Sequence, residues 1–189
     1  MKLRFRAAVP MIFLVFAASV WAADMTWDAE FGNTLYNTPK GWSTTQNSGS
    51  IMLIPPDLAP GEQAAIVITP GGELTGEFKD ALTAFRAELR GHVKATESKT
   101  ESLSADEGYP VLHVAEQLLD EKGTTTQYRY FFASHPGNRA EFVVLIASTA
   151  DAYKRYGAVF GEFVKTLAYK NARPGAHATS APATQADSK

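Results

Sequence analysis

Hydrophobic residues recur at every third or fourth position in two stretches of the chain, a pattern typical of amphipathic helices. The first stretch covers residues 75–91, and its apolar face is formed by Phe78, Ala81, Leu82, Phe85 and Leu89. Thr75 is expected to be the N-cap and Glu77 to lie in the first turn, where a negative charge is favourable. Gly91 is expected to end this helix.

The second stretch predicts a helix near the end of the domain. Its apolar face is formed by Tyr153, Tyr156, Phe160, Phe163, Val164 and Leu167. Thr149 is its expected N-cap, and Asp151 complements the helix dipole. Gly157 and Gly161 lie beside this face, and each costs about 1 kcal/mol relative to alanine. Close packing of the helix against a sheet or another helix is expected to offset this cost; a ligand against the bare backbone is the alternative.

Short apolar runs predict strands around these helices. Three runs are apolar on both alternating faces, as in strands that are covered on two sides: residues 51–54, 64–69 and 142–147. Residues 109–119 and 124–134 predict a hairpin across the turn at 120–123. The polar stretch at 96–103 (TESKTESL) predicts an edge strand whose charges discourage pairing with other chains.

The segment TPGGELTG, residues 69–76, joins a predicted strand to the first helix. Glycines in this position are found in nucleotide-binding loops, but the segment matches neither G-x-G-x-x-G nor the P-loop. It also lacks the Lys-Ser/Thr pair that would contact phosphate and Mg²⁺. We interpret it as a flexible turn; a small anion at the helix N-terminus is the alternative.

The order of the elements predicts the fold class. Short strands are followed by a helix, a meander of strands and a closing helix. Two amphipathic helices and a sheet that is buried on both faces predict an α+β fold, a helix–sheet–helix sandwich around a mainly antiparallel sheet.

Both ends of the chain differ from its middle. Residues 1–22 have a basic start, an apolar run, and Val20 and Ala22 at the positions that a signal peptidase reads; cleavage after Ala23 is the alternative. Residues 171–189 are rich in Ala, Thr, Ser and Pro, which predicts a disordered tail or, alternatively, a tether. A single α/β sandwich domain is therefore expected over residues 23–170, in the periplasm or secreted.

Charge and cysteine content narrow the range of partners. The chain has 18 basic and 20 acidic residues, and loss of residues 1–22 moves its formal charge from −2 to −5. The basic stripe that nucleic acid or an anionic membrane would require is not expected. The apolar run near the N-terminus is too short for a permanent membrane anchor. The absence of cysteine excludes disulfides, thiol nucleophiles and a lipid anchor on an N-terminal cysteine.

Two short motifs carry a resemblance to a known family. A Pro-x-Gly-Trp turn, Pro39-Lys40-Gly41-Trp42, follows a short strand, and a second strand ends in Ile54-Pro55-Pro56. With the order of the helices and strands, these motifs resemble the PsbP-like fold, which includes PsbP, the Mog proteins and, nearest to this chain, the bacterial periplasmic DcrB-like proteins. DcrB-like proteins are typically lipoproteins, so the missing cysteine departs from that group. The resemblance implies binding or assembly roles and assigns no functional residue here.

Motifs of catalysis and metal binding are absent from the sequence. There is no G-x-S-x-G elbow, and the four histidines form neither H-x-H nor H-E-x-x-H. No catalytic residue, metal ligand or cofactor is therefore assigned. His113 lies mid-strand with Glu116 on the opposite face, and we interpret it as a half-buried histidine with a cross-strand partner. A pH-sensing or ligand-contacting role is the alternative.

Aromatic residues are the best candidates for a site. Tyr128, Tyr130 and Phe132 alternate onto one strand face, opposite to Arg129, and Tyr109 is expected to approach from the paired strand. Further candidates are Trp42, Tyr153 and Tyr156. An aromatic stripe of this kind is typical of a core; the alternative is an apolar pocket whose phenolic hydroxyls hold a ligand. For Trp42, burial over one end of the sheet is favoured over an exposed binding tip.

The sequence therefore predicts an exported, non-enzymatic binding or accessory protein of the cell envelope. It would act through contacts with another envelope protein or through a small apolar ligand. A hydrolase or other enzyme with a non-local active site is the first alternative. An envelope assembly factor with a large exposed apolar patch is the second.

Overall fold

The computed structural model describes residues 26–47, 49–104 and 109–171, and it describes no side chains between residues 97 and 104. The predicted signal peptide at 1–22 and the predicted tail, except for Asn171, lie outside the described residues. Within the described residues, no helix is long and apolar enough to cross a membrane.

A seven-stranded antiparallel sheet forms the centre of the described chain. In spatial order its strands are β3 (Ser43–Gln46), β4 (Ile51–Ile54), β5 (Ala64–Glu73), β9 (Arg139–Ala147), β8 (Thr125–Ser134), β7 (Pro110–Leu119) and β6 (Lys94–Ser104). The predicted hairpin is formed by β7 and β8, and the predicted edge strand is β6. A small second sheet, which the sequence did not predict, consists of β1 (Ala29–Phe31), β2 (Thr34–Tyr36) and β10 (Ala168–Tyr169).

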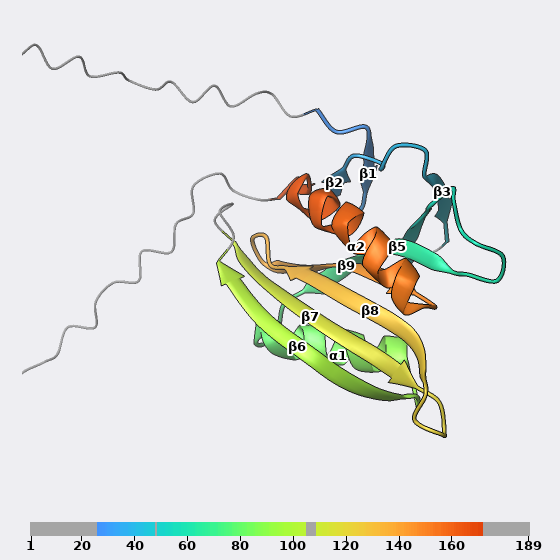
Figure 1. Ribbon diagram of the computed structural model, residues 1–189. Helices are drawn as coiled ribbons and strands as arrows, with labels where there is room; N and C mark the ends of the chain where they lie inside the picture. The colour runs from blue at the N-terminus through green and yellow to red at the C-terminus, as the bar shows by residue number, and fades with distance from the viewer. Residues whose placement is uncertain (1–25, 48, 105–108, 172–189) are drawn as a thin grey trace, which may run out of the picture.

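Two helices lie on opposite faces of the large sheet, which confirms the predicted sandwich (Figure 1). The helix α2 (Ala150–Lys165) packs over β5, β9 and β8. The helix α1 (Phe78–Arg90) lies on the other face, against β9, β8 and β7. Thr149 caps α2 as predicted, because its hydroxyl accepts a hydrogen bond from the backbone N–H of Ala152 at 3.1 Å.

The two faces bury cores of unequal size. The larger core, beneath α2, includes the helix residues Tyr156, Phe160 and Phe163 and the alternate sheet residues Leu53, Ile66, Ile68, Val143 and Leu145. The smaller core, beneath α1, includes Leu82, Val114, Phe131, Phe142 and Val144. Only one residue of α1, Leu82, is fully buried, so this helix is held by a narrower apolar contact than α2.

The boundaries of α1 differ from the prediction in two ways. The N-cap is Glu77 rather than Thr75, and its side chain makes no capping hydrogen bond. The chain still follows the sheet at Leu74, whose N–H donates to the carbonyl oxygen of Asn138 at 2.9 Å, so the helix begins later than expected. Gly91 ends the helix as predicted, with a positive φ of 57°. Leu89 does not belong to the buried face, since 40% of it is exposed.

Residues 69–73 of the segment that was predicted to be a flexible turn belong to a strand. The strand β5 continues to Glu73, and its pairing with β9 shifts between Pro70 and Glu73, which marks a β-bulge at Gly71 and Gly72. A Cβ atom on Gly71 would lie 1.8 Å from the carbonyl oxygen of Ala140, so only glycine fits there. The proline and glycines therefore bend the strand locally and do not end it.

The close approach that was predicted for Gly157 and Gly161 is wrong. A Cβ atom added at either position would have no heavy atom within 4 Å beyond its own helix and chain neighbours. Both glycines are only half-buried and lie outside the face that packs on the sheet. The larger side chains at Tyr156 and Phe160 fill the interface instead, so nothing in the described packing requires a glycine at these two positions.

Two leucines of α1 provide a test of this packing. Leu82→Ala should lower the free energy of unfolding by about 2–5 kcal/mol, because it leaves a cavity in the smaller core. Leu89→Ala, on the same helix, should lower it by less than about 1 kcal/mol, since that side chain is already exposed. Urea unfolding followed by circular dichroism would measure both values. Equal losses would contradict the described orientation of α1.

Candidate functional site

The aromatic residues that the sequence singled out lie in three places around the larger core. Trp42 is half-buried and meets Tyr156 edge-on, with 5.6 Å between the ring centroids. The backbone N–H of Trp42 donates to the carbonyl oxygen of Pro39 at 3.0 Å, which closes the Pro-Lys-Gly-Trp turn. Gly41 supplies the positive φ of 81° that this turn contains. The Tyr156 hydroxyl donates to a carboxylate oxygen of Asp57 at 3.0 Å. Trp42 is thus part of the packing against α2.

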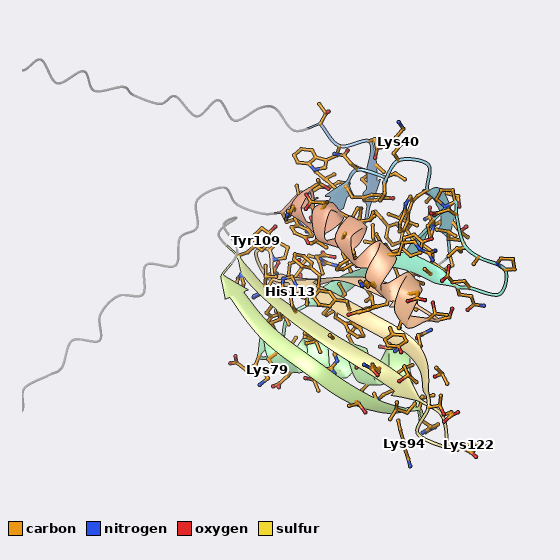
Figure 2. The ribbon with its side chains drawn as sticks, viewed as in Figure 1. Lys40, Lys79, Lys94, Tyr109, His113 and Lys122 are labelled. Carbon is orange, nitrogen blue, oxygen red and sulfur yellow. The ribbon has the colours of Figure 1, made fainter. Side chains whose placement is uncertain are left out.

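A second group lies where α2 meets β8. Tyr128 and Tyr153 have ring centroids 5.6 Å apart, and burial, together with the nearby Tyr130, raises the pKa of Tyr153 to about 12. His113 Nδ1 lies 3.0 Å from the Tyr130 hydroxyl, a cross-strand contact of the predicted kind. Figure 2 shows His113 on β7 and Tyr109 directly before that strand, near the larger core beneath α2.

The third place is near the small sheet. Tyr109 meets Tyr169 edge-on at 5.4 Å between centroids, and the hydroxyls of Tyr169 and Ser134 lie 2.6 Å apart. The six predicted aromatic residues therefore lie around one core, and their described ring contacts fall into separate groups: Trp42 with Tyr156, Tyr128 with Tyr153, Tyr109 with Tyr169, and Tyr130 with His113 and Phe160. Their role as a ligand pocket stays a prediction.

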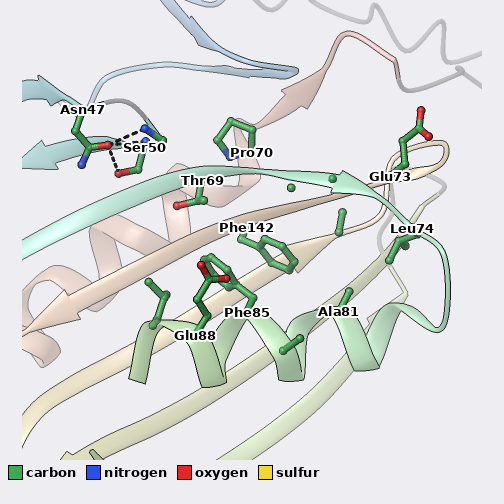
Figure 3. A pocket seen from close by; sticks show the side chains of 16 residues that line it. Asn47, Ser50, Thr69, Pro70, Glu73, Leu74, Ala81, Phe85, Glu88 and Phe142 are labelled. Atoms are coloured by element: carbon green, nitrogen blue, oxygen red, sulfur yellow. Dashed lines mark hydrogen bonds between the residues drawn. The ribbon is translucent and has the colours of Figure 1, made fainter. Parts of the chain in front are cut away.

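A groove on the opposite face of the sheet is the candidate site that the structure adds. It lies between α1 and the strand β5, has a volume of about 710 Å³, and is called here the α1–β5 groove (Figure 3). Its lining residues are Asn47, Gly49, Ser50, Thr69, Pro70, Gly71, Gly72, Glu73, Leu74, Ala81, Ala84, Phe85, Glu88, Leu89, Ala140 and Phe142. Clefts that bind small molecules commonly have volumes in this range.

The groove exists because α1 covers only part of its face of the sheet. Phe85 stacks on Phe142 of β9 with ring centroids 4.2 Å apart, which places the helix over β9 and leaves the neighbouring face of β5 open. Ala81 and Ala84 have small side chains along the groove wall, so the space is not filled from the helix. Sequence reasoning missed this site, although alanines beside the apolar stripe and the Pro-Gly-Gly bulge were visible signals.

The groove combines an apolar base with polar ends. Figure 3 shows Phe85 and Phe142 between the helix and β5, and the Glu88 carboxylate points from α1 toward β5. At one end, the Asn47 side-chain oxygen accepts hydrogen bonds from the N–H groups of Gly49 and Ser50 at 3.0 and 2.8 Å, which fixes that turn. Among the described residues that line the groove there is no lysine, arginine or histidine, so the only formal charges of these residues are the carboxylates of Glu73 and Glu88.

A buried ionic cluster holds the helical wall of the groove. The Glu116 carboxylate of β7 is fully buried and accepts from Arg86 of α1 through Nε and Nη2, at 3.1 and 2.9 Å. Arg129 Nη1 lies 3.6 Å from the other Glu116 oxygen, and burial lowers the pKa of Arg129 against the opposing effect of Glu116. Arg129 also donates to the carbonyl oxygen of Leu89 at 3.4 Å, in the last turn of α1.

A second buried carboxylate supports the strand wall. The Glu141 side chain accepts from the N–H of Gly71 at 3.3 Å, and Arg139 donates to the carbonyl oxygen of Gly71 at 2.6 Å. Burial raises the pKa of Glu141, against the opposing effects of the Gly71 N–H, Asn33 and Arg139. These side chains replace ladder partners at the bulge, where the backbone of Gly71 is paired with no residue of β9.

Comparison with known proteins identifies the fold. No family model matches the chain, and no curated protein matches it either. The solution structure of the cyanobacterial PsbP protein CyanoP from Synechocystis sp. PCC 6803 matches over 72% of this chain and 86% of that protein, with 10% identity and a TM-score of 0.54. The chain has the PsbP-like fold. A protein of unknown function from Pseudomonas aeruginosa, PA94, covers 71% of this chain and 99% of its own length at 13% identity, with a TM-score of 0.48.

Removal of the Glu116 charge should release α1. Glu116→Gln leaves Arg86 and Arg129 without their shared buried carboxylate, so the free energy of unfolding should fall by about 3–5 kcal/mol. Glu162→Gln is the control, because its ion pair with Lys165 is exposed and should contribute less than about 1 kcal/mol. Urea unfolding would measure both, and a loss as small as that of the control would refute the role of the cluster.

Glu141 should make the stability depend on pH. Its raised pKa means that the folded state binds the proton more tightly than the unfolded state does. The associated stability is fully present below the ordinary carboxyl pKa and is lost as the pH rises through the raised, folded-state value. Glu141→Gln should flatten this decline in urea-unfolding free energies measured from about pH 4 to pH 7. The exposed Glu121→Gln should retain it, and an unchanged decline in Glu141→Gln would refute the assignment.

Proposed function

We propose that the protein is an exported, non-enzymatic binding or accessory protein of the cell envelope and that the α1–β5 groove holds its ligand or partner. The observation that supports this function is the open apolar base of the groove between α1 and β5. The packing that buries Leu82 leaves Leu89 40% exposed at the groove. Binding of a ligand that removes this apolar surface from water is favourable, because it lowers the free energy of the system.

The proposed export from the cytoplasm rests on the sequence of residues 1–22, which has the three parts of a signal peptide. Within the PsbP-like fold, we propose that the bacterial periplasmic DcrB-like proteins are the nearest group. The Pro39-Lys40-Gly41-Trp42 turn and the order of the elements support this kinship. Because the fold hosts proteins with different roles, the proposed function depends on the groove and not on the fold.

A matched pair of substitutions tests the groove. Ala84 and Ala87 are both exposed on α1, but only Ala84 lines the groove. Ala84→Trp should fill the space and reduce binding of the neutral apolar dye Nile red at least about tenfold, which corresponds to roughly 1.4 kcal/mol. Ala87→Trp adds the same ring outside the groove and should leave this binding unchanged. Fluorescence titration of the purified protein would measure both affinities.

Two results would contradict the proposed function. If Nile red does not bind the protein, the groove does not accept apolar ligands. If Ala84→Trp and Ala87→Trp bind the dye equally well, the apolar site lies elsewhere, and the aromatic residues around α2 become the next candidates.

A further inference from the structure

We infer that the α1–β5 groove recognises an extended segment of a partner protein in which a bulky apolar residue stands beside a lysine or arginine. The inference rests on the proposed function and adds the chemistry of the occupant. It is supported by the charge of the groove, its apolar base and the exposed Gly72 of the β5 bulge.

The charge favours a cation. The Glu88 carboxylate points toward β5 across the apolar base (Figure 3), and none of the described residues that line the groove is basic. No described ion pair or hydrogen bond involves the Glu88 side chain. The nearby Arg139 is engaged with Gly71 and Glu141 instead. An ammonium or guanidinium group of the occupant would give Glu88 a partner, whereas an anionic ligand would be repelled.

The apolar base favours a bulky neighbour to that cation. Phe85 and Phe142 stack face to face next to Ala81 and Ala84, so one large aliphatic or aromatic side chain fits between the helix and the strand. Glu88 follows Phe85 by three residues on α1, which places both side chains on the same side of the helix. The cation and the apolar residue of the occupant should therefore be close neighbours in its sequence.

The backbone of the bulge favours a polypeptide. No residue of β9 is paired with Gly71 or Gly72, and Gly72 is exposed at the groove. A Cβ atom at Gly72 would have no heavy atom within 4 Å, so another chain can approach its peptide groups closely. The strand β4 pairs with β5 only from Ile66 to Ile68, so residues 69–73 have no β4 partner on that side. Extended peptides bind to such open strand edges through main-chain hydrogen bonds, while side-chain pockets supply the specificity. A compact apolar molecule would leave these peptide groups unused.

Three labelled hexapeptides would test the inference: Gly-Lys-Phe-Leu-Lys-Gly, and the same peptide with serine or glutamate in place of both lysines. Fluorescence anisotropy with the purified protein should rank the lysine peptide first and the glutamate peptide last. The preference for lysine over serine should be roughly two- to fivefold, as an exposed ion pair provides. It should shrink in about 0.5 M NaCl, because salt screens exposed charges.

Charge substitutions on α1 sharpen the test. Glu88→Gln should remove the preference for lysine, and Glu88→Lys should reverse it, so that the glutamate peptide binds best. Glu88 is exposed, so these variants should remain folded. Glu121→Gln is the matched control, because this exposed glutamate lies in the turn between β7 and β8 and does not line the groove. Ala84→Trp should lower the affinity for all three peptides, because the added ring fills the groove.

The outcomes separate this inference from the proposed function. Equal binding of the three peptides, or an unchanged ranking in Glu88→Lys, would overturn the cation preference while the groove remains a binding site. Nile red binding that is sensitive to Ala84→Trp, without peptide binding, would overturn the peptide occupant in favour of a small apolar ligand. Loss of both kinds of binding from the unmodified protein would refute the proposed function as well.

Discussion

Burial of the strand β9 on both faces is the constraint on which the rest of the structure depends. Val143, Leu145 and Ala147 face α2, while Phe142 and Val144 face α1. A strand this apolar requires a cover on each side, so one helix must pack on each face. The 13 residues of α1 extend only about 20 Å, and a helix of that length cannot cover a wide sheet. The α1–β5 groove follows from this shortfall.

Polar groups then decide where the shorter helix lies. Apolar packing holds α1 mainly through Leu82 and the stacked Phe85, and such contacts carry little directional information. The hydrogen bonds from Arg86 to Glu116 and from Arg129 to the Leu89 carbonyl group are directional, and they join α1 to β7 and β8. A buried ion pair contributes little net stability compared with apolar packing, but an arrangement that separated Arg86 from Glu116 would leave a buried charge without its partner, which is costly.

The sequence predicted those parts of the structure that depend on periodicity. The apolar stripe of α2, the hairpin and the strands that are buried on both faces could be predicted, because alternation and helical spacing indicate directly which face of an element is buried. The start of α1 was misplaced because the chain stays bonded to the sheet as far as Leu74. Leu89 lies on the predicted stripe, but its side chain lines the open groove and is 40% exposed, and periodicity does not report where such a space lies between elements.

The candidate groove could not be predicted from periodicity, since it is a space between elements that are distant in the sequence. Its walls come from the β3–β4 turn, the β5 bulge and α1, and a glycine-rich segment that looks like a loop forms one wall as a strand. The buried Glu141 explains how this wall keeps its shape: its carboxylate binds the N–H of Gly71, where no ladder partner is available. The exposed Gly72 next to it lines the groove, so the irregularity that makes this strand look like a loop in the sequence also shapes one wall of the groove.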